Sequence, residues 1–333
     1  MKQQVNQALG VALGPKTVLS FGDIRERDKM HNFPQVLLLG NGLNILNGGE
    51  SWKEFLNDIK DESIDVDINQ LKSPMPLQAI LISNNSIDKK LKLKRDKLLP
   101  KNRLKDDKFS LSGFLSLGFD EILTTNYTYE LEQACFGGKP LSEYRLNKLT
   151  ASTYGNEVDK RILINTYNKV VYQEKEQHIW HIHGEAKKPS SMILGHYYYL
   201  NLVNKVTNYC KNKGNYYELR QKENKPINIS SWIDAFIMGD VYIVGQSFDF
   251  GESDLWWLLN RKFNEKSRHG KVYFYEPYIH SQQEKIKLLK VFKVDCRDLG
   301  ISETTVFGET KIDYGLFYKK TLEDIKKEMK ENK

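Results

Sequence analysis

The segment that most constrains the fold is the apolar run Val36–Leu39, which leads directly into Gly40-Asn41-Gly42. Four consecutive apolar residues indicate a strand covered on both faces, as strands of parallel sheets are. The glycines predict a turn, and a helical pattern follows from Ser51, a residue type suited to an N-cap. A strand, a glycine turn and a helix build the phosphate sites of many α/β proteins. We therefore treat this turn as a candidate nucleotide-phosphate loop; the alternative is a turn that only joins a strand to a helix.

The sequence of this turn departs from that of one class of nucleotide-binding enzyme, the dehydrogenases. The dinucleotide fingerprint of dehydrogenases has a third glycine three residues after the second, and this chain has Ile45 at that position. The sequence therefore argues against a hydride-transferring dehydrogenase.

Strand-like and helix-like segments alternate along the chain, which predicts an α/β fold with a doubly wound, mostly parallel, Rossmann-like sheet and an inserted, mainly helical region. We expect an N-terminal extension (1–33), a main domain (34–320) with helical insertions at about 60–118 and 197–235, and a charged C-terminal helix (321–333). The predicted strands are 36–39, 122–125, 161–165, 178–184, 191–194, 241–244, 271–275 and 292–296. The main predicted helices start at Ser51 and cover 127–135, 197–220, 232–238, 253–259 and 284–291.

Four of the predicted strands end in polar or glycine-rich residues. These ends are Gly40–Asn44, Thr124–Asn126, His183-Gly184 and Gly245–Ser247. In open parallel sheets, ligands bind beyond the carboxyl ends of the strands. The four ends therefore predict one shared site.

Several classes of protein are disfavoured by composition. No apolar run approaches the roughly 18 residues of a membrane span, and no signal-peptide core begins the chain, so we expect a cytoplasmic protein with no membrane partner. The cysteines Cys135, Cys210 and Cys296 lie far apart, and no C-x-x-C pair exists to hold a structural zinc. No acidic or cysteine cluster accompanies the histidines of HIWHIHG, so we expect no metal.

The net charge of +7 is concentrated in one segment, 89–108. No aromatic residue interrupts this segment, so it lacks a stacking platform for single-stranded nucleic acid. We interpret it as a solvated helix and loop, and nucleic acid as an improbable direct partner.

Four sequence blocks follow one another along the chain: GNGLNILNGGESWKEFL, ILTTNYTYELE, HIHG and IVGQSFDFGESD. In this order they resemble the SIR2-like (sirtuin-fold) family of prokaryotic antiphage-defence NADases. The first three are also similar to abortive-infection proteins that carry a GNG loop.

The resemblance implies roles for individual residues. Asn126 would orient the nicotinamide ribose and a water molecule, and His183 would be the general base. The residues implied to bind NAD are Gly40, Asn41, Gly42, Asn44, Thr125, Gly245, Ser247 and Glu276.

Two departures from the sirtuin pattern matter. Deacylating sirtuins carry a four-cysteine zinc module, which three cysteines cannot build. Their Pro-Asp-Phe-Arg element is replaced by Gly49–Trp52, which leaves Glu50 as the only candidate for a carboxylate in this loop.

The resemblance favours an NAD+ glycohydrolase, with NAD as substrate, that is kept inactive until an antiphage-defence partner or assembly into a homo-oligomer triggers it. Cleavage of the nicotinamide–ribose bond passes through an oxocarbenium-like centre and needs a base near neutral pKa, which histidine supplies. The alternative is a non-catalytic sensor of NAD or ADP-ribose that gates a partner protein. A deacylase or an ADP-ribosyltransferase ranks third, and a nucleic-acid-binding protein last.

Overall fold

The computed structural model describes residues 33–98, 111–138, 141, 145, 148–152, 161–223, 225, 227–277, 282–301, 304–306 and 309–331. The predicted extension 1–33, apart from its last residue, and the second part of the basic segment 89–108 lie outside the described residues.

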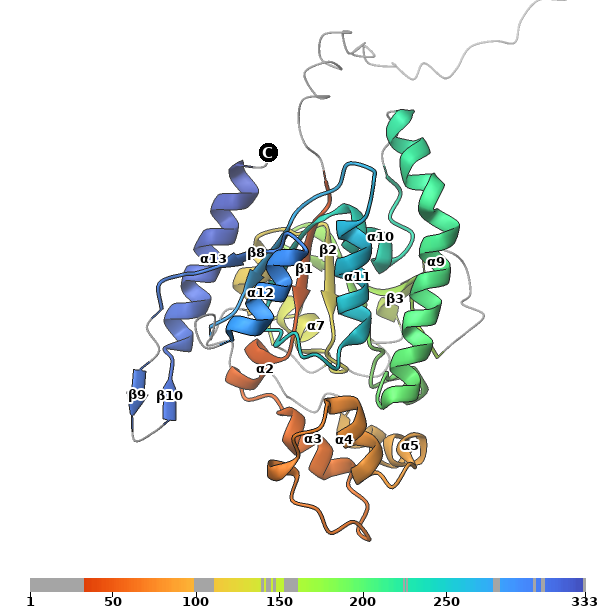
Figure 1. Cartoon of the computed structure of the whole chain (residues 1–333), viewed down its shortest axis with the longest axis vertical. Coiled ribbons are helices and arrows are strands. Elements are labelled where there is room, and N and C mark those ends of the chain that lie inside the picture. Colours follow the sequence, from red (N-terminus) through yellow and green to blue (C-terminus); the bar gives the residue numbers. More distant parts are fainter. Residues whose placement is uncertain are drawn as a thin grey trace, which may run out of the picture.

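Within the described residues, eight strands form one sheet in the order β3-β4-β5-β2-β1-β6-β7-β8 (Figure 1). The six strands β5-β2-β1-β6-β7-β8 pair in parallel with their neighbours in the sheet. Strand β4 is antiparallel to β5, and β3 is antiparallel to β4. This confirms the predicted α/β fold with a mostly parallel, Rossmann-like sheet. The strands are β1 (Gln35–Leu39), β2 (Glu121–Thr124), β3 (Thr150–Ser152), β4 (Thr166–Tyr172), β5 (Lys175–His181), β6 (Asp240–Val244), β7 (Val272–Tyr275) and β8 (Asp295–Arg297), and a separate hairpin joins β9 (Thr304–Val306) to β10 (Glu309–Lys311).

Helices cover both faces of the sheet, and the side chains of β1 from Val36 to Leu39, which alternate between the two faces, are all apolar and buried. Val36 and Leu38 pack into one core cluster, with α9 to α12, and Leu37 and Leu39 pack into another, with α2, α6, α7 and α13. Strands buried on both faces are what an uninterrupted apolar run predicts. The helices on the first face are α9 (His196–Lys222), α10 (Trp232–Met238), α11 (Ser253–Phe263) and α12 (Gln283–Val291); those on the second are α2 (Gly42–Leu46), α6 (Leu111–Ser116), α7 (Glu130–Cys135) and α13 (Tyr314–Glu331).

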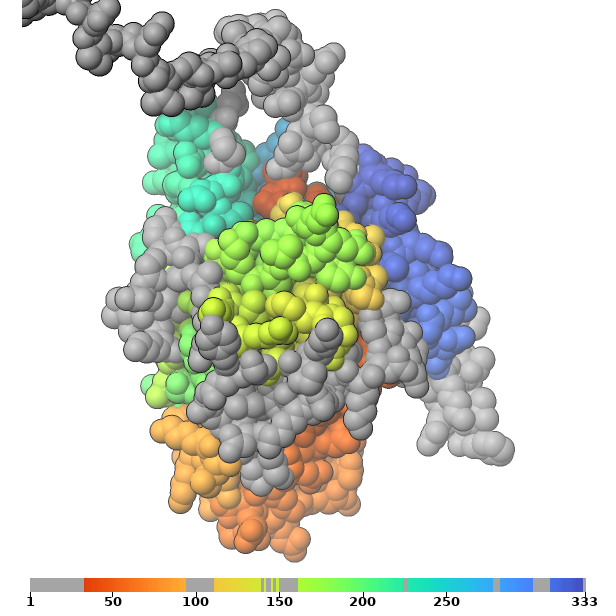
Figure 2. Space-filling model, turned by 180° about the vertical axis from the view of Figure 1, so that it is seen from behind, coloured from red at the N-terminus to blue at the C-terminus, as the bar shows by residue number. Residues whose placement is uncertain are grey.

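A third core cluster holds a small helical group at the carboxyl end of β1 (Figures 1 and 2). Ser51 begins this group as predicted: its hydroxyl accepts from the Glu54 amide, and the Glu54 carboxylate accepts from the Ser51 amide, which completes a capping box. The group consists of α3 (Trp52–Ile59), the 3-10 turn η1 (Ile68–Gln70), α4 (Met75–Ile82) and α5 (Ile87–Leu98). It therefore forms one wall above the ends of the parallel strands.

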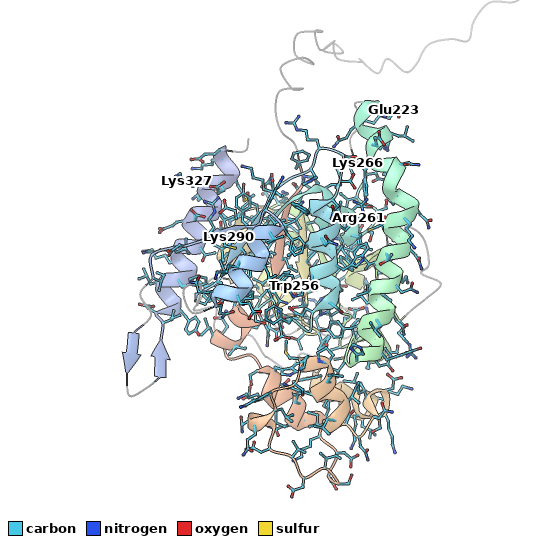
Figure 3. All side chains as sticks on the ribbon, in the orientation of Figure 1. Glu223, Trp256, Arg261, Lys266, Lys290 and Lys327 are labelled. Atoms are coloured by element: carbon cyan, nitrogen blue, oxygen red, sulfur yellow. The ribbon has the colours of Figure 1, made fainter. Side chains whose placement is uncertain are left out.

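The outer helix faces carry charged side chains among a few exposed apolar ones, such as Val291 of α12. Lys290 of α12 and Lys327 of α13 are exposed and Arg261 of α11 is partly exposed; all three are labelled in Figure 3. No helix in the described ranges combines the length and the apolar character that a bilayer span requires.

Two predicted strands are wrong. The segment 161–165 is irregular because side chains take its carbonyls: Ser231 Oγ donates to Ile164 O and Trp232 Nε1 donates to Leu163 O. The segment 191–194 begins with the last residue of the 3-10 turn η2 (Pro189–Ser191) and is irregular after it.

The sequence reading also missed three features. Strand β4 returns to β5 through a two-residue turn of Gln173 and Glu174, both at positive φ, where Asn-Gly would be the usual signal. The short helix α2 precedes the predicted helix at Ser51. The C-terminal helix α13 begins at Tyr314 instead of 321.

Candidate functional site

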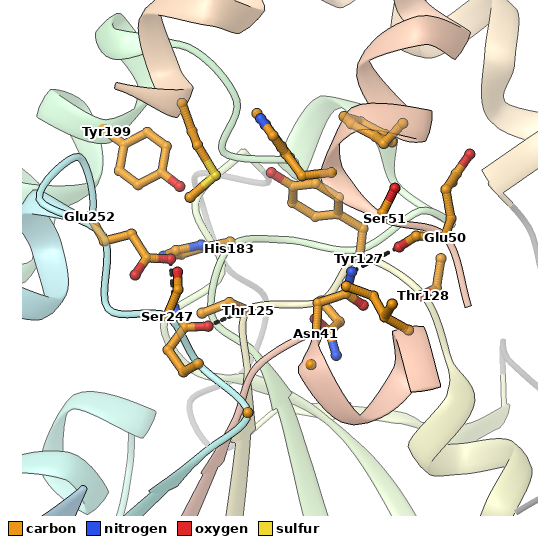
Figure 4. A pocket seen from close by; sticks show the side chains of 18 residues that line it. Asn41, Glu50, Ser51, Thr125, Tyr127, Thr128, His183, Tyr199, Ser247 and Glu252 are labelled. Carbon is orange, nitrogen blue, oxygen red and sulfur yellow. Dashed lines mark hydrogen bonds between the residues drawn. The ribbon is translucent and has the colours of Figure 1, made fainter. Parts of the chain in front are cut away.

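A cavity of about 300 Å³ lies at the carboxyl ends of β1, β2, β5 and β6 (Figure 4). Strand β1 is the first strand of the sheet along the chain, and the connections run outward from it in both directions, through β2 on one side and β6 on the other. Open α/β sheets bind ligands at such a switch point. The residues lining the cavity are Asn41, Gly42, Ile45, Glu50, Ser51, Trp52, Phe55, Met75, Thr125, Asn126, Tyr127, Thr128, His183, Tyr199, Gly245, Gln246, Ser247 and Glu252.

The cavity brings together most of the residues that the sequence singled out, from all four predicted strand ends. The predicted residues among its lining are Asn41, Gly42, Thr125, Asn126, His183, Gly245 and Ser247. Glu50, the candidate loop carboxylate, also lines it, and its backbone carbonyl accepts from Asn41 Nδ2 at 2.8 Å.

Three predicted NAD contacts, Gly40, Asn44 and Glu276, are not among the described residues that line this cavity. Asn44 belongs to α2, and its side chain is buried, with Nδ2 donating to Glu130 at 3.3 Å. Glu276 follows β7 and accepts from Lys285 Nζ at 3.3 Å. Asn44 thus holds α2 against α7, and Glu276 holds α12.

The glycines of the first turn allow a close approach between two loops. The amide of Gly42 donates to the carbonyl of Gly245 at 2.8 Å, so this N–H is already used. A Cβ on Gly40 would lie 2.4 Å from the same carbonyl. Glycine at these positions therefore lets the turns after β1 and β6 touch. Gly40 itself borders the site only through its carbonyl, which accepts from Asn126 Nδ2 at 3.3 Å.

Asn126 is fixed by its backbone as well as by its side chain. Its amide donates to Thr124 Oγ1 at 3.1 Å, and its carbonyl accepts from His181 Nδ1 at 2.7 Å. The other ring nitrogen of His181 donates to Glu132 at 3.0 Å. Burial opposes the charged ring, but the carboxylate of Glu132 outweighs it and raises the pKa of His181 to about 9. A charged His181 therefore donates from both nitrogens and locks Asn126 in place.

His183 lies two residues beyond the end of β5 and is 2% exposed. Its Nε2 donates to Asp254 Oδ2 at 2.9 Å. Burial by itself lowers the pKa of His183, but the negative charge of Asp254 and this hydrogen bond outweigh burial, so the pKa is raised. Within the described residues Nδ1 has no hydrogen-bond partner, which leaves its lone pair free to accept a proton from a ligand or water.

Gly184 explains why a glycine follows this histidine. Its φ is +87°, and a Cβ would lie 2.0 Å from the Ser191 carbonyl. Only glycine fits there without moving the backbone that presents His183.

A family model for the SIR2-like domain matches residues 120–292, just over half of the 333-residue chain. The chain belongs to the SIR2-like family. The matched range contains Asn126, His183 and Ser247. Membership of this family suggests that the cavity is involved in binding NAD. No curated protein matches the chain.

In this SIR2-like protein the carboxylates Glu252 and Asp254 are site residues that sequence reasoning missed. Asp254 is fully buried against His183, and Glu252 lines the cavity at 6% exposure. Both sit where α11 begins, a place where acidic side chains usually cap the helix. Glu252 occupies the N-cap position but makes no side-chain cap. Sequence alone could not separate these two carboxylates from ordinary helix-start residues.

Aromatic rings also line the SIR2-like cavity. Trp52 stacks on Phe55 with centroids 5.6 Å apart, and Phe55 contacts Tyr127 at 5.7 Å. Tyr199 of α9 packs edge-on against His183 at 5.3 Å. Tyr199 is both buried and part of the cavity wall.

The three histidines of HIWHIHG engage three different carboxylates. His178 contacts Glu121, His181 contacts Glu132 and His183 contacts Asp254. Among the residues that the structure describes, no three potential metal ligands gather into a metal-binding group.

Proposed function

We propose that this SIR2-like protein is an NAD+ glycohydrolase that cleaves NAD to nicotinamide and ADP-ribose. The observation that carries the proposal is the meeting of Asn126 with the His183–Asp254 pair at one cavity, on the carboxyl edge of the sheet. A locked amide and a buried, carboxylate-paired histidine are what hydrolysis of this bond requires.

The chemistry needs a base more than an acid. The nicotinamide leaving group is a cationic pyridinium, so it departs without a proton, and positive charge develops on the ribose as in glycoside hydrolysis. The Asn126 amide would hold a ribose hydroxyl or the attacking water by hydrogen bonds. His183 Nδ1 would accept the proton of that water, while Asp254 holds the ring through Nε2 and stabilises the imidazolium that forms.

A dinucleotide needs more room than the first cavity provides. A second cavity of about 330 Å³ shares Ser247 with the first and is also lined by Asp249, Phe250 and Lys285. Lys285 in turn contacts Glu276. The nicotinamide half would lie beside His183 and the adenosine half beyond Ser247, so Glu276 would act on the adenosine side through Lys285.

We further propose that the enzyme serves abortive infection. An unrestrained NADase would deplete its own cell, so a defence partner or assembly into a homo-oligomer would hold it inactive until infection. This biological setting comes from the family resemblance.

The test is nicotinamide release from NAD by the purified protein, alone and with lysate of phage-infected cells. We expect release that disappears in Asn126→Ala and His183→Ala. His178→Ala is the matched control, because His178 lies on β5, the strand that leads to His183, and its carboxylate partners lie outside the cavity. Equal release from all four proteins would refute the mechanism. Bound NAD without release in either condition would favour the sensor alternative.

A further inference from the structure

Glu252 carries a carboxyl oxygen that nothing in the described protein satisfies. Oε1 accepts from Gln246 Nε2 at 2.5 Å, and Gln246 Oε1 accepts in turn from Thr125 Oγ1 at 3.3 Å. Oε2 is buried and has no hydrogen-bond partner within the described residues. Burying a carboxyl oxygen without a hydrogen-bond partner is costly, so such a group in a native protein calls for an explanation, such as a bound ligand or a functional role.

The surroundings of Glu252 supply no cation for it. The described residues that line the cavity include no lysine or arginine. His183 is the one cationic candidate beside Glu252 among them, and its Nε2 already donates to Asp254. The titratable groups that influence Glu252, or are influenced by it, are Asp249 and Asp254 from its own segment, His183 from the turn after β5, Tyr127 from the turn after β2 and Tyr199 from α9.

We propose that Glu252 is a specificity residue whose partner is the positive charge of the oxidised nicotinamide ring, so that the cavity selects NAD+ over NADH. The inference rests on the proposed function in placing the nicotinamide half beside His183. Figure 4 shows Glu252 on the same side of the cavity as His183, with the Tyr199 ring nearby. The pyridinium of NAD+ is a cation and can pair with a buried carboxylate. The dihydronicotinamide of NADH is neutral and has no positive charge to pair with it.

The protonation of Glu252 follows from the same geometry. Burial, with a further contribution from the charge of Asp254, raises the pKa of Glu252 to about 7, although His183 opposes the rise. The unliganded carboxyl is thus about half protonated at pH 7. A bound pyridinium favours the carboxylate, so the carboxyl proton passes to solvent as NAD+ binds. NADH removes no such proton.

The experiment is calorimetric titration with NAD+ and with NADH, each in two buffers of different ionisation enthalpy, at pH 7. Asn126→Ala serves as the background so that turnover does not consume NAD+. We expect tenfold or greater preference for NAD+ and release of about half a proton with NAD+ alone. Glu252→Gln in this background should bring the two affinities within about twofold and abolish proton release. Glu323→Gln, an exposed residue of α13, is the matched control.

The outcomes separate the two proposals. Equal affinities in the background protein, or an unchanged preference in Glu252→Gln, would overturn the role of Glu252 even if the enzyme hydrolyses NAD. Selective binding without hydrolysis in the wild type would support Glu252 and overturn the glycohydrolase. If Glu252→Gln fails to fold, the affinity ratio in the background protein decides: a rise from pH 6 to pH 8 supports the proposal, and a flat ratio overturns it.

Discussion

Substituting Glu132 by glutamine should remove a large and pH-dependent contribution to stability. The Glu132 carboxylate is fully buried and accepts from His181 at 3.0 Å and from Asn168 at 2.9 Å. The pKa of His181 rises from an ordinary 6.5 to about 9. At about 1.4 kcal/mol per pH unit, the charged ring contributes about 3 kcal/mol.

The sign of the pH dependence follows from the raised pKa. Because the folded protein holds the His181 proton more tightly than the unfolded chain, the contribution is complete below pH 6.5 and is lost as the pH rises through 9. Lys262 acts in the opposite direction: burial lowers its pKa to about 7, so its titration favours the folded state as the pH rises. The contribution of His181 is therefore measured as the difference between wild type and variant in how the free energy of unfolding changes with pH.

The assay is urea unfolding followed by tryptophan fluorescence at pH 6 and pH 9. We expect the wild type to lose about 3 kcal/mol more than Glu132→Gln between these two pH values, because the variant lacks the carboxylate that keeps His181 charged. Glu218→Gln, at an exposed ion pair on α9, should behave as the wild type does. An equal loss in wild type and Glu132→Gln would refute the buried ion pair as the anchor of Asn126.

Three further predictions concern the site and its supports. Asp254→Asn removes the charge that raises the pKa of His183, so the acid limb of the pH profile of NAD hydrolysis should move to lower pH, with lower kcat. Gly184→Ala places a Cβ 2.0 Å from the Ser191 carbonyl and should destabilise the protein by more than about 2 kcal/mol in urea unfolding; a stable variant would contradict the geometry. Ser51→Ala removes the N-cap of α3 and should cost about 1 kcal/mol, measured in the same way.

The parts of the fold that follow from sequence are those that a single short pattern dictates. The run Val36–Leu39 predicted a strand buried on both faces, and Ser51 with Glu54 predicted a helix start. Polar residues directly after apolar strands predicted Asn126 and His183 at one edge of the sheet. Parallel strands place their carboxyl ends together whatever the loops between them do.

The features that escaped the sequence depend on partners distant along the chain. The carbonyls of 161–165 are taken by side chains of Ser231 and Trp232, which no local pattern reveals. Gly40 is required by the turn after β6, more than 200 residues away in sequence. In the sequence, Glu252 and Asp254 resemble ordinary residues at the start of a helix. Only the tertiary structure shows that Glu252 lines the cavity and that Asp254 accepts a hydrogen bond from His183.

The most direct test of the account is a single-turnover experiment with enzyme in excess over NAD at pH 7, in which nicotinamide is quantified by chromatography. Excess enzyme makes one slow turnover visible even when an activating signal is missing. The account predicts nicotinamide formation by the wild type and by His178→Ala, and a loss of at least about a hundredfold in Asn126→Ala and His183→Ala. Nicotinamide formed at the wild-type rate by His183→Ala would contradict the central claim that this histidine, held by Asp254, is the base.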